Sequence, residues 1–154
     1  MSRVDRLLSD YAYYHQTRGN VLCHAIGIPL ITYSIIALLL LLPLKNSVTA
    51  TEVLIGASFI YYLTLDYRLA IGMLLLAGLF DVLARQIHQT PIALAALAAG
   101  WIFQAIGHTV YEKNSPAFFR NLIHLLIGPI FLLNELFHFR SINLVSKTPI
   151  PPRF

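Results

Sequence analysis

Long apolar stretches separated by short polar breaks dominate this chain. The five stretches cover residues 21–44, 48–65, 69–83, 92–110 and 118–139. Because these runs are long and show no alternation of apolar and polar residues, they predict α-helices rather than strands. A helix that crosses a bilayer needs roughly 20 apolar residues. The first, fourth and fifth stretches meet this length, whereas the second and third are either two short spans or one re-entrant hairpin.

The segment before the first long stretch shows the pattern of an amphipathic helix. Between residues 3 and 16, apolar and aromatic side chains recur at helical spacing at Val4, Leu7, Leu8, Tyr11 and Tyr14. A helix of this kind lies in the plane of a membrane surface. We therefore expect an all-α chain that forms one integral membrane domain. Its parts are an interfacial helix over 1–20, a polytopic transmembrane helix bundle of about four to five segments over 21–139, and a polar tail over 140–154.

The composition agrees with a lipid environment, because hydrophobic residues make up 57% of the chain and charged residues only 12%. Soluble domains contain about 45–50% apolar and about 25% charged residues, so this chain has too few charges for a water-exposed surface. The net charge is +4, and the basic residues are scattered rather than gathered in a dense run. This distribution argues against nucleic acid as a partner and fits anionic lipid headgroups or an acidic substrate.

Three local patterns concern packing within the predicted bundle. The stretch 92–110 is rich in alanine and contains Gly100, and small residues let helix backbones approach closely in lipid, so we expect this helix to be central. Asp81 and Arg85 are four residues apart and predict a local ion pair. Glu135, near the far end of the last helix, is assigned no functional role.

Histidines are the most informative polar residues, because ionisable groups at membrane depth are costly and usually functional. His24 lies near the start of the first long stretch, and His108 and His124 lie near the end of the fourth and the start of the fifth. If the two marginal stretches both cross the membrane, or neither does, these three lie on one membrane face. His15 and Glu112 join them there. Two further histidines are predicted on the opposite face, His88 and His138.

Spacing brings some of these residues onto shared helix faces. His108 and Glu112 are four residues apart, and Gln104 is one turn earlier on the same face. His15 and His24 are nine residues apart and would lie on opposite faces of a continuous helix. We therefore expect a helix break at Gly19, between the two, so that both rings point inward.

The donor types at these positions suit a divalent iron site. Neutral imidazoles with one carboxylate bind iron(II) and leave coordination positions open for oxygen and substrate. Neighbouring Asn20 and Gln104 are suited to orienting the ligand rings. The alternative interpretation is structural, because a histidine at a membrane interface often only hydrogen-bonds a carbonyl group. Spacing alone does not decide between the two. Other chemistries fit poorly, since G-x-S-x-G and phosphate-binding glycine loops are absent and the single cysteine, Cys23, cannot form a Cys-pair metal motif.

Two segments carry a resemblance to a known family. The first has the order His-x4-Asn-x3-His-x2-Gly-Ile-Pro over residues 15–29, and the second runs from Gly-Trp-Ile-Phe-Gln at residues 100–104 through Gly-His-x3-Glu-x3-Pro-Ala to Asn-Leu at 121–122. In this order the motifs resemble those of the membrane-bound 2-hydroxy fatty acid dioxygenase family. The resemblance covers most of the chain in segment layout and a smaller part of it in specific motifs.

The resemblance implies an iron(II)-dependent α-oxidation of fatty acids. Molecular oxygen would cleave the bond between C1 and C2 of a 2-hydroxy fatty acid and yield a fatty acid one carbon shorter. The family's functional histidines fall on His15, His24 and His108, and Glu112 falls on the motif's carboxylate. One departure is Arg120, which stands where the family often has an acidic residue. Family members imply an endoplasmic reticulum membrane or a bacterial inner membrane as the location.

From the residues and the resemblance together we expect Fe²⁺ at the membrane surface, bound by three histidines and Glu112. The 2-hydroxy acid would chelate the iron, with its acyl chain among the apolar helices and its carboxylate near Arg18, Lys113 or Arg120. His124 is expected beside the ligands, with Asn20 and Gln104. Two alternatives remain open, which are a haem-binding membrane protein with two axial histidines and a non-enzymatic lipid-binding or scaffold bundle. Nothing in the sequence indicates an oligomeric state.

Overall fold

A computed structural model describes residues 2–87, 89–113 and 123–137 of the chain. Within these residues the secondary structure is helical, apart from an isolated bridge between Pro43 and Thr49, and the predicted all-α class is confirmed. The elements are α1 (Arg3–Tyr13), α2 (Arg18–Leu39), the 3₁₀-helix η1 (Lys45–Ser47), α3 (Ala50–Leu63), α4 (Tyr67–Ile87), α5 (Thr90–Ile106), the π-helix η2 (Gly107–Tyr111) and α6 (His124–Phe137).

In the described part of the chain, three helical segments are long and apolar enough to cross a membrane. They are α2, α4 and the continuous segment formed by α5 and η2. The helices α3 and α6 are apolar but shorter, and the predicted stretch 118–139 lies partly outside the described residues. The marginal stretch 69–83 is part of a longer helix than expected, because α4 continues to Ile87.

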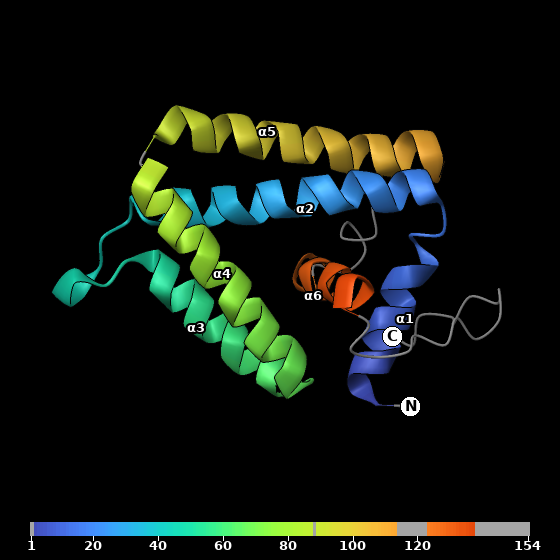
Figure 1. Ribbon diagram of the computed structural model, residues 1–154, viewed down its shortest axis with the longest axis horizontal. Helices are drawn as coiled ribbons and strands as arrows, with labels where there is room; N and C mark the ends of the chain where they lie inside the picture. Colours follow the sequence, from blue (N-terminus) through green and yellow to red (C-terminus); the bar gives the residue numbers. More distant parts are fainter. Residues whose placement is uncertain (1, 88, 114–122, 138–154) are drawn as a thin grey trace.

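The helices α2 and α5 lie side by side and run in opposite directions (Figure 1). They approach closely at Gly27 and Gly100, where a Cβ atom on either glycine would lie 2.9 Å from the carbonyl oxygen of the other. The small residues of α5 therefore do permit close packing. However, α2 contacts α3, α4, α5 and α6, whereas α5 packs mainly against α2. The expectation that the alanine-rich helix is central is thus wrong, and α2 holds that position.

We expect Gly100→Ala to lower the stability of the protein, because its new methyl group would meet the Ile31 side chain at 2.7 Å as well as the Gly27 carbonyl oxygen. Overpacking of this kind costs about 1–3 kcal/mol. Gly78→Ala in α4 is the matched control, since nothing lies within 4 Å of its added Cβ. Thermal unfolding in detergent should show a lower Tm for Gly100→Ala and an equal or higher Tm for Gly78→Ala, and equal effects would contradict the packing described.

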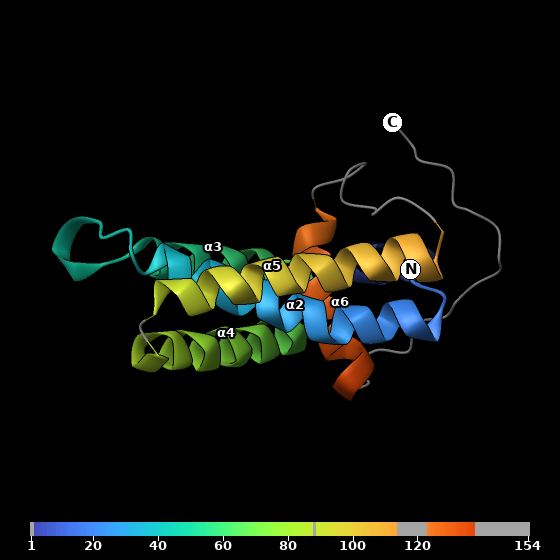
Figure 2. The same cartoon turned by 90° about the horizontal axis from the view of Figure 1, so that it is seen from above.

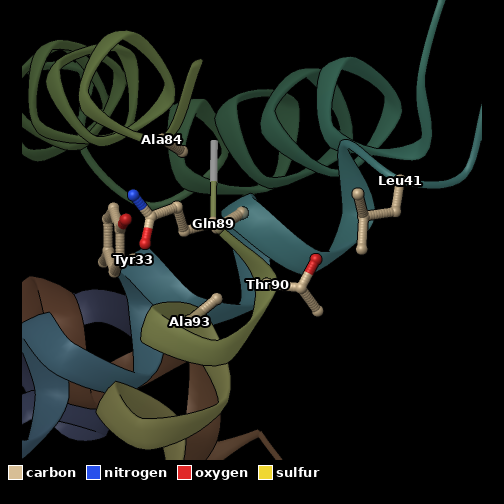
Figure 3. A pocket seen from close by; sticks show the side chains of 7 residues that line it. Tyr33, Leu41, Ala84, Gln89, Thr90 and Ala93 are labelled. Atoms are coloured by element: carbon tan, nitrogen blue, oxygen red, sulfur yellow. The ribbon is translucent and has the colours of Figure 1, made fainter. Parts of the chain in front are cut away.

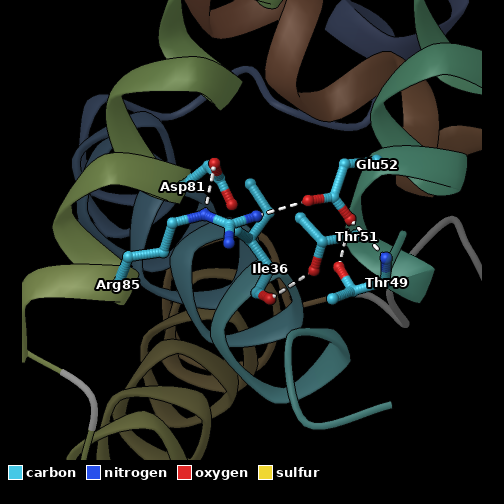
Figure 4. A network of polar contacts seen from close by, with 6 residues as sticks. All are labelled: Ile36, Thr49, Thr51, Glu52, Asp81 and Arg85. Atoms are coloured by element: carbon cyan, nitrogen blue, oxygen red, sulfur yellow. Dashed lines mark hydrogen bonds and ion pairs between the residues drawn. The ribbon is translucent and has the colours of Figure 1, made fainter. Parts of the chain in front are cut away.

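The helices α3 and α4 form an antiparallel pair that a polar network joins to α2 (Figure 4). The Arg85 guanidinium donates to the Asp81 carboxylate at 2.9 Å and also pairs with Glu52 on α3. Thr51 donates its hydroxyl to the Ile36 carbonyl oxygen of α2 at 2.8 Å. The predicted Asp81–Arg85 pair is confirmed. Because Arg85 has two acidic partners, α4 can extend past the apolar stretch without leaving this charge unpaired.

The helices α1 and α6 pack on each other beside the turn between α3 and α4, and α6 runs across the direction of α2 and α5 (Figure 2). The apolar face of α1 is buried in this core, where Val4 is 1% and Leu8 0% exposed. The amphipathic pattern of α1 therefore arises from packing inside the protein. The boundary predicted at residue 20 is also too late, because α1 ends at Tyr13 and α2 begins at Arg18.

A small cavity lies where the end of α2 meets the start of α5, at the opposite end of this helix pair from His24 and His108 (Figure 3). Its volume is about 10 Å³, which is room for about one water molecule. Tyr33, Ala84 and Thr90 are among its lining residues. The cavity is too small for an acyl chain and contains none of the predicted site residues.

Candidate metal centre

Three histidines from separate elements converge at one end of the α2–α5 pair. His15 lies in the link between α1 and α2, His24 lies in the second turn of α2, and His108 lies in η2. One ring nitrogen from each lies within 4.8 Å of those of the other two. The residues are 6%, 4% and 3% exposed, respectively. The structure therefore brings together the three histidines that the sequence singles out, in a buried cluster of nitrogen donors.

The break that lets His15 and His24 face each other comes earlier than Gly19. The link of residues 14–17 separates the two helices, and Thr17 caps α2 by accepting a hydrogen bond from the Asn20 N–H at 3.3 Å. Gly19 lies inside the first turn of α2, where a Cβ atom would lie 2.2 Å from the Tyr111 ring. The expectation of a break at Gly19 is thus wrong, and this glycine instead makes room for an aromatic side chain.

Backbone carbonyl groups set the tautomers of two rings. Nδ1 of His15 lies 2.7 Å from the Tyr11 carbonyl oxygen, and Nδ1 of His24 lies 2.9 Å from the Asn20 carbonyl oxygen. A carbonyl oxygen can only accept, so Nδ1 carries the hydrogen in both rings and Nε2 carries a lone pair. Burial lowers the pKa of His15 to about 2, and the neighbouring His24 ring adds to this effect. His15 is therefore neutral at pH 7, which is the form that binds metal ions.

The two Nε2 atoms face each other, and this contact needs a third partner. They lie 3.0 Å apart in His15 and His24, and two lone pairs at this distance repel each other. A cation between them would remove the repulsion. Two nitrogens that bind one metal at about 2.1 Å with a right angle between the bonds lie about 3.0 Å apart. Histidines that bind a metal usually donate the N–H of their other ring nitrogen to a group such as a backbone carbonyl oxygen, as the Nδ1–H groups of both rings do here. The pair therefore fits two adjacent ligands of one metal ion.

His108 completes the donor set from the π-helix. Its Nδ1 is buried and has no hydrogen-bond partner in the described part of the chain. The π-helical turn is closed by the Glu112 N–H, which donates to the Gly107 carbonyl oxygen at 3.2 Å. Such turns occur frequently at functional sites. At Gly107 a Cβ atom would lie 2.3 Å from the Asn20 side-chain oxygen, so the absence of a side chain allows His108 to approach α2. Three imidazoles suit iron, zinc, copper or nickel.

Glu112 lies outside the histidine cluster and binds the start of α2. Its Oε1 accepts hydrogen bonds from the Thr17 N–H at 2.7 Å, the Thr17 hydroxyl at 3.0 Å and the Asn20 amide at 3.2 Å. Burial would raise the pKa of Glu112, but the hydrogen bonds from Thr17 and Asn20 outweigh burial and lower it. The carboxylate is therefore ionised at pH 7. Its contacts join the end of η2, which carries His108, to the residues between His15 and His24.

Most of the other residues named in the sequence analysis lie near the histidine cluster or at the same end of the helix pair. Asn20 and Gln104 are buried beside the cluster, and the Gln104 side chain interacts with the His24 ring. Arg18 and Lys113 are exposed at the histidine end of the helix pair. His124 is also buried but pairs with Asp10. Arg120 lies outside the described residues, as do His88 and His138, and Glu135, which was assigned no functional role, is exposed on α6.

Three residues in or beside the centre were not predicted from the sequence. Tyr11 supplies the carbonyl group that orients His15 and stacks its ring on the His15 ring, with centroids 4.0 Å apart. Thr17 caps α2 and binds Glu112. Asp10 pairs with His124. Two of these had a signal in the sequence, since Tyr11 is one helical turn before His15 and threonine is a preferred N-cap residue.

Comparison with known proteins assigns the chain to a family. The family described as "Mpo1-like: 2-hydroxy-palmitic acid dioxygenase Mpo1-like" matches residues 1–140. The 2-hydroxy-palmitic acid dioxygenase MPO1 of Saccharomyces cerevisiae is 35% identical over 132 residues, which cover 83% of this chain and 76% of that protein. No solved structure matches the chain. The family match includes the three clustered histidines, and the chain therefore belongs to the Mpo1-like family of 2-hydroxy-palmitic acid dioxygenases.

Proposed function

We propose that this chain is an integral membrane dioxygenase that shortens 2-hydroxy fatty acids by one carbon, with Fe²⁺ bound by His15, His24 and His108. The family and the dioxygenase named for its 35% identical relative support the reaction. The observation that carries the metal site is the 3.0 Å contact between two Nε2 atoms whose lone pairs face each other. The three helices of membrane-spanning length support the location.

The proposed reaction balances without an added reductant. A 2-hydroxy acid, RCH(OH)COOH, and O₂ give RCOOH, CO₂ and H₂O. The C1–C2 bond breaks, C2 becomes the carboxyl carbon of the shorter acid, and C1 leaves as carbon dioxide. Both carbons are oxidised, and the electrons they lose reduce O₂ completely. The reaction needs only the acid and oxygen as substrates, together with a metal that can exchange electrons.

The ligand set fits this requirement when the metal is iron. Iron(II) bound by imidazoles supplies electron exchange with O₂ and keeps coordination positions open, whereas zinc suits the same ligands but has no redox chemistry. The chain itself orients the rings, through the Tyr11 and Asn20 carbonyl groups on His15 and His24. Burial of the three rings excludes bulk water from the centre. Glu112 acts as a link between the ligand-bearing segments rather than as a ligand.

The place of the centre suits a lipid substrate. His24 and His108 lie near the same end of two span-length helices, so the centre would lie close to one membrane surface. A fatty acid could then place its polar end at the histidines and its acyl chain along the apolar helix faces. Arg18 and Lys113 are exposed at this end, where they would attract the substrate carboxylate from the membrane surface.

The haem alternative fits the geometry less well. Two axial histidines bind haem iron from opposite sides of the porphyrin, so their nitrogens lie about 4 Å apart with bonds of about 2 Å. The Nε2 atoms of His15 and His24 are closer than this, at 3.0 Å, and the ring of His108 lies beside both. The cluster therefore favours a single ion over a porphyrin between two rings.

Metal exchange tests the proposal. Detergent-purified protein is stripped of metal, reloaded with Fe²⁺ or with Zn²⁺, and given 2-hydroxypalmitic acid and oxygen. We expect the shortened acid from the iron-loaded protein only, although both ions bind. Equal product from the zinc-loaded protein would contradict a role for electron exchange at the metal. Binding of neither ion would favour the non-enzymatic helix bundle.

We expect substitution of the exposed basic residues to weaken substrate capture. Arg18→Gln and Lys113→Gln should raise KM severalfold and leave kcat nearly unchanged, because both side chains are solvent-exposed and act on the carboxylate before chemistry. The effect should decrease at high salt, which screens exposed charges. Arg3→Gln, at the exposed start of α1, is the control. An unchanged KM in the double variant would remove these residues from substrate binding.

A further inference from the structure

A buried histidine that does not belong to the metal cluster joins α6 to α1. The side chain of His124, the first residue of α6, is 4% exposed, and its Nε2 lies 2.8 Å from the Asp10 carboxylate on α1. An ionised carboxylate only accepts, so Nε2 donates. The other ring nitrogen, Nδ1, is buried and has no partner among the described residues. A buried nitrogen without a hydrogen-bond partner lowers the stability of the fold, and an apolar side chain at this position would avoid that cost. The presence of a histidine here is therefore best explained by its hydrogen bond to Asp10.

The residue that follows Asp10 connects this pair to the metal centre. The Tyr11 ring stacks on the His15 ring, with centroids 4.0 Å apart and an angle of 8° between the planes. The His124 ring meets the Tyr11 ring edge-on at 5.8 Å, and the Phe131 ring lies 4.9 Å from it. The Tyr11 carbonyl oxygen also accepts the Nδ1–H of His15 at 2.7 Å. Tyr11 is therefore the residue that orients His15, and α6 encloses it.

We propose that the Asp10–His124 pair is a positioning device for the metal ligand His15, acting through Tyr11. Val4 and Leu8 fix the packing of α1 in the apolar core, but they lie in the first two turns of the helix. The pair joins the last turn of α1 to the first residue of α6, directly beside Tyr11. The pair fixes the position of Tyr11 along the α1 axis and its rotation about that axis. It thereby fixes the carbonyl group and the ring that His15 contacts. His124 is a positioning residue, and it binds neither metal nor substrate.

This inference rests on the proposed function, because it requires that His15 binds the metal. The test measures Co²⁺ binding to detergent-purified protein by titration, with the visible absorption of the bound ion as the spectroscopic signature. His124→Leu removes the donor to Asp10. His124→Gln keeps an N–H donor at a similar place. Val4→Ala is the matched control, because it removes buried apolar volume from α1 in the same core, in the first turn of the helix and away from Tyr11.

We expect His124→Leu to weaken Co²⁺ binding about tenfold, the lower range for residues that support a metal ligand, and to shift the spectrum toward that of His15→Ala. His124→Gln should restore both toward wild type. Val4→Ala should lower the Tm and leave affinity and spectrum unchanged. If His124→Leu does not fold, Asp10→Asn gives the same test at a side chain that is 42% exposed, with a smaller loss of affinity expected.

The outcomes separate this inference from the proposed function. Wild-type affinity and spectrum in His124→Leu, or in Asp10→Asn where the first variant does not fold, would overturn the inference and leave the metal centre intact. A loss of affinity in Val4→Ala equal to that in His124→Leu would also overturn it, since helix packing alone would then explain the effect. No Co²⁺ binding by the wild type would overturn the metal centre itself, and the inference with it.

Discussion

Replacement of His108 by alanine is expected to remove bound metal from the purified protein and to abolish turnover of 2-hydroxy fatty acids. His108 is one of three buried nitrogen donors within 4.8 Å of one another, and its removal leaves only two of these donors for the metal. Loss of a group that only supports a ligand costs about 10–100-fold in metal affinity, so loss of a ligand should cost more than about 100-fold. His15→Ala and His24→Ala should give the same result.

Iron content by mass spectrometry and product formation under oxygen check this prediction. His88→Ala is the matched control, because the sequence predicts this histidine on the opposite membrane face from the three ligands. Circular dichroism and the elution volume in detergent show whether each variant is folded. Full iron content and turnover in folded His108→Ala would contradict the three-histidine centre. Loss of both in His88→Ala as well would show that the assay reports general damage.

Replacement of Glu112 by alanine is expected to have the next largest effect, through the positions of the histidines rather than through a lost ligand. The carboxylate accepts three hydrogen bonds from Thr17 and Asn20, and Asn20 in turn orients His24. We expect metal affinity to fall by about 10–100-fold and the free energy of unfolding by about 1.5 kcal/mol, the lower value for hydrogen bonds to a charged group. Because Glu112→Gln keeps an acceptor oxygen, its metal affinity and its free energy of unfolding should lie between those of the wild type and those of Glu112→Ala.

The spectrum of bound Co²⁺ distinguishes a link from a ligand at this position. If Glu112 only links η2 to α2, the Glu112→Gln variant binds Co²⁺ more weakly but with the wild-type absorption spectrum. If Glu112 is a fourth ligand, as the sequence suggests, the spectrum of this variant shifts because the donor set changes. Glu135→Gln on the exposed face of α6 is the control for loss of a carboxylate. A shifted spectrum in Glu112→Gln alone would contradict the role described.

The helical class and the meeting of the histidines are predictable from the sequence for simple reasons. Long apolar runs leave few alternatives to helices. His24 lies at the start of one such run and His108 at the end of another, so antiparallel packing of the two helices is enough to bring them together. The Asp81–Arg85 pair depends only on spacing within one helix, and it forms as predicted. These features depend on local pattern or on helix direction.

Features that depend on tertiary contacts were not predictable in the same way. Periodicity cannot distinguish an amphipathic helix on a membrane from one packed on another helix, and α1 has its apolar face in the core. The π-helical turn after Ile106 changes where side chains point relative to α-helical spacing. Glu112 shares a predicted face with His108, yet it reaches Thr17 instead. A carboxylate that caps a helix and one that binds a metal look alike in sequence.

Turnover of a 2-hydroxy fatty acid by the iron-loaded protein is the most direct test of the proposed reaction. Detergent-purified protein loaded with Fe²⁺ is given 2-hydroxypalmitic acid under oxygen, and mass spectrometry follows the acid, its shortened product and carbon dioxide. We expect an acid one carbon shorter, formed in an amount equal to the carbon dioxide released and to the oxygen consumed, with no added reductant. Unchanged 2-hydroxypalmitic acid in the presence of iron-loaded, folded protein would contradict it.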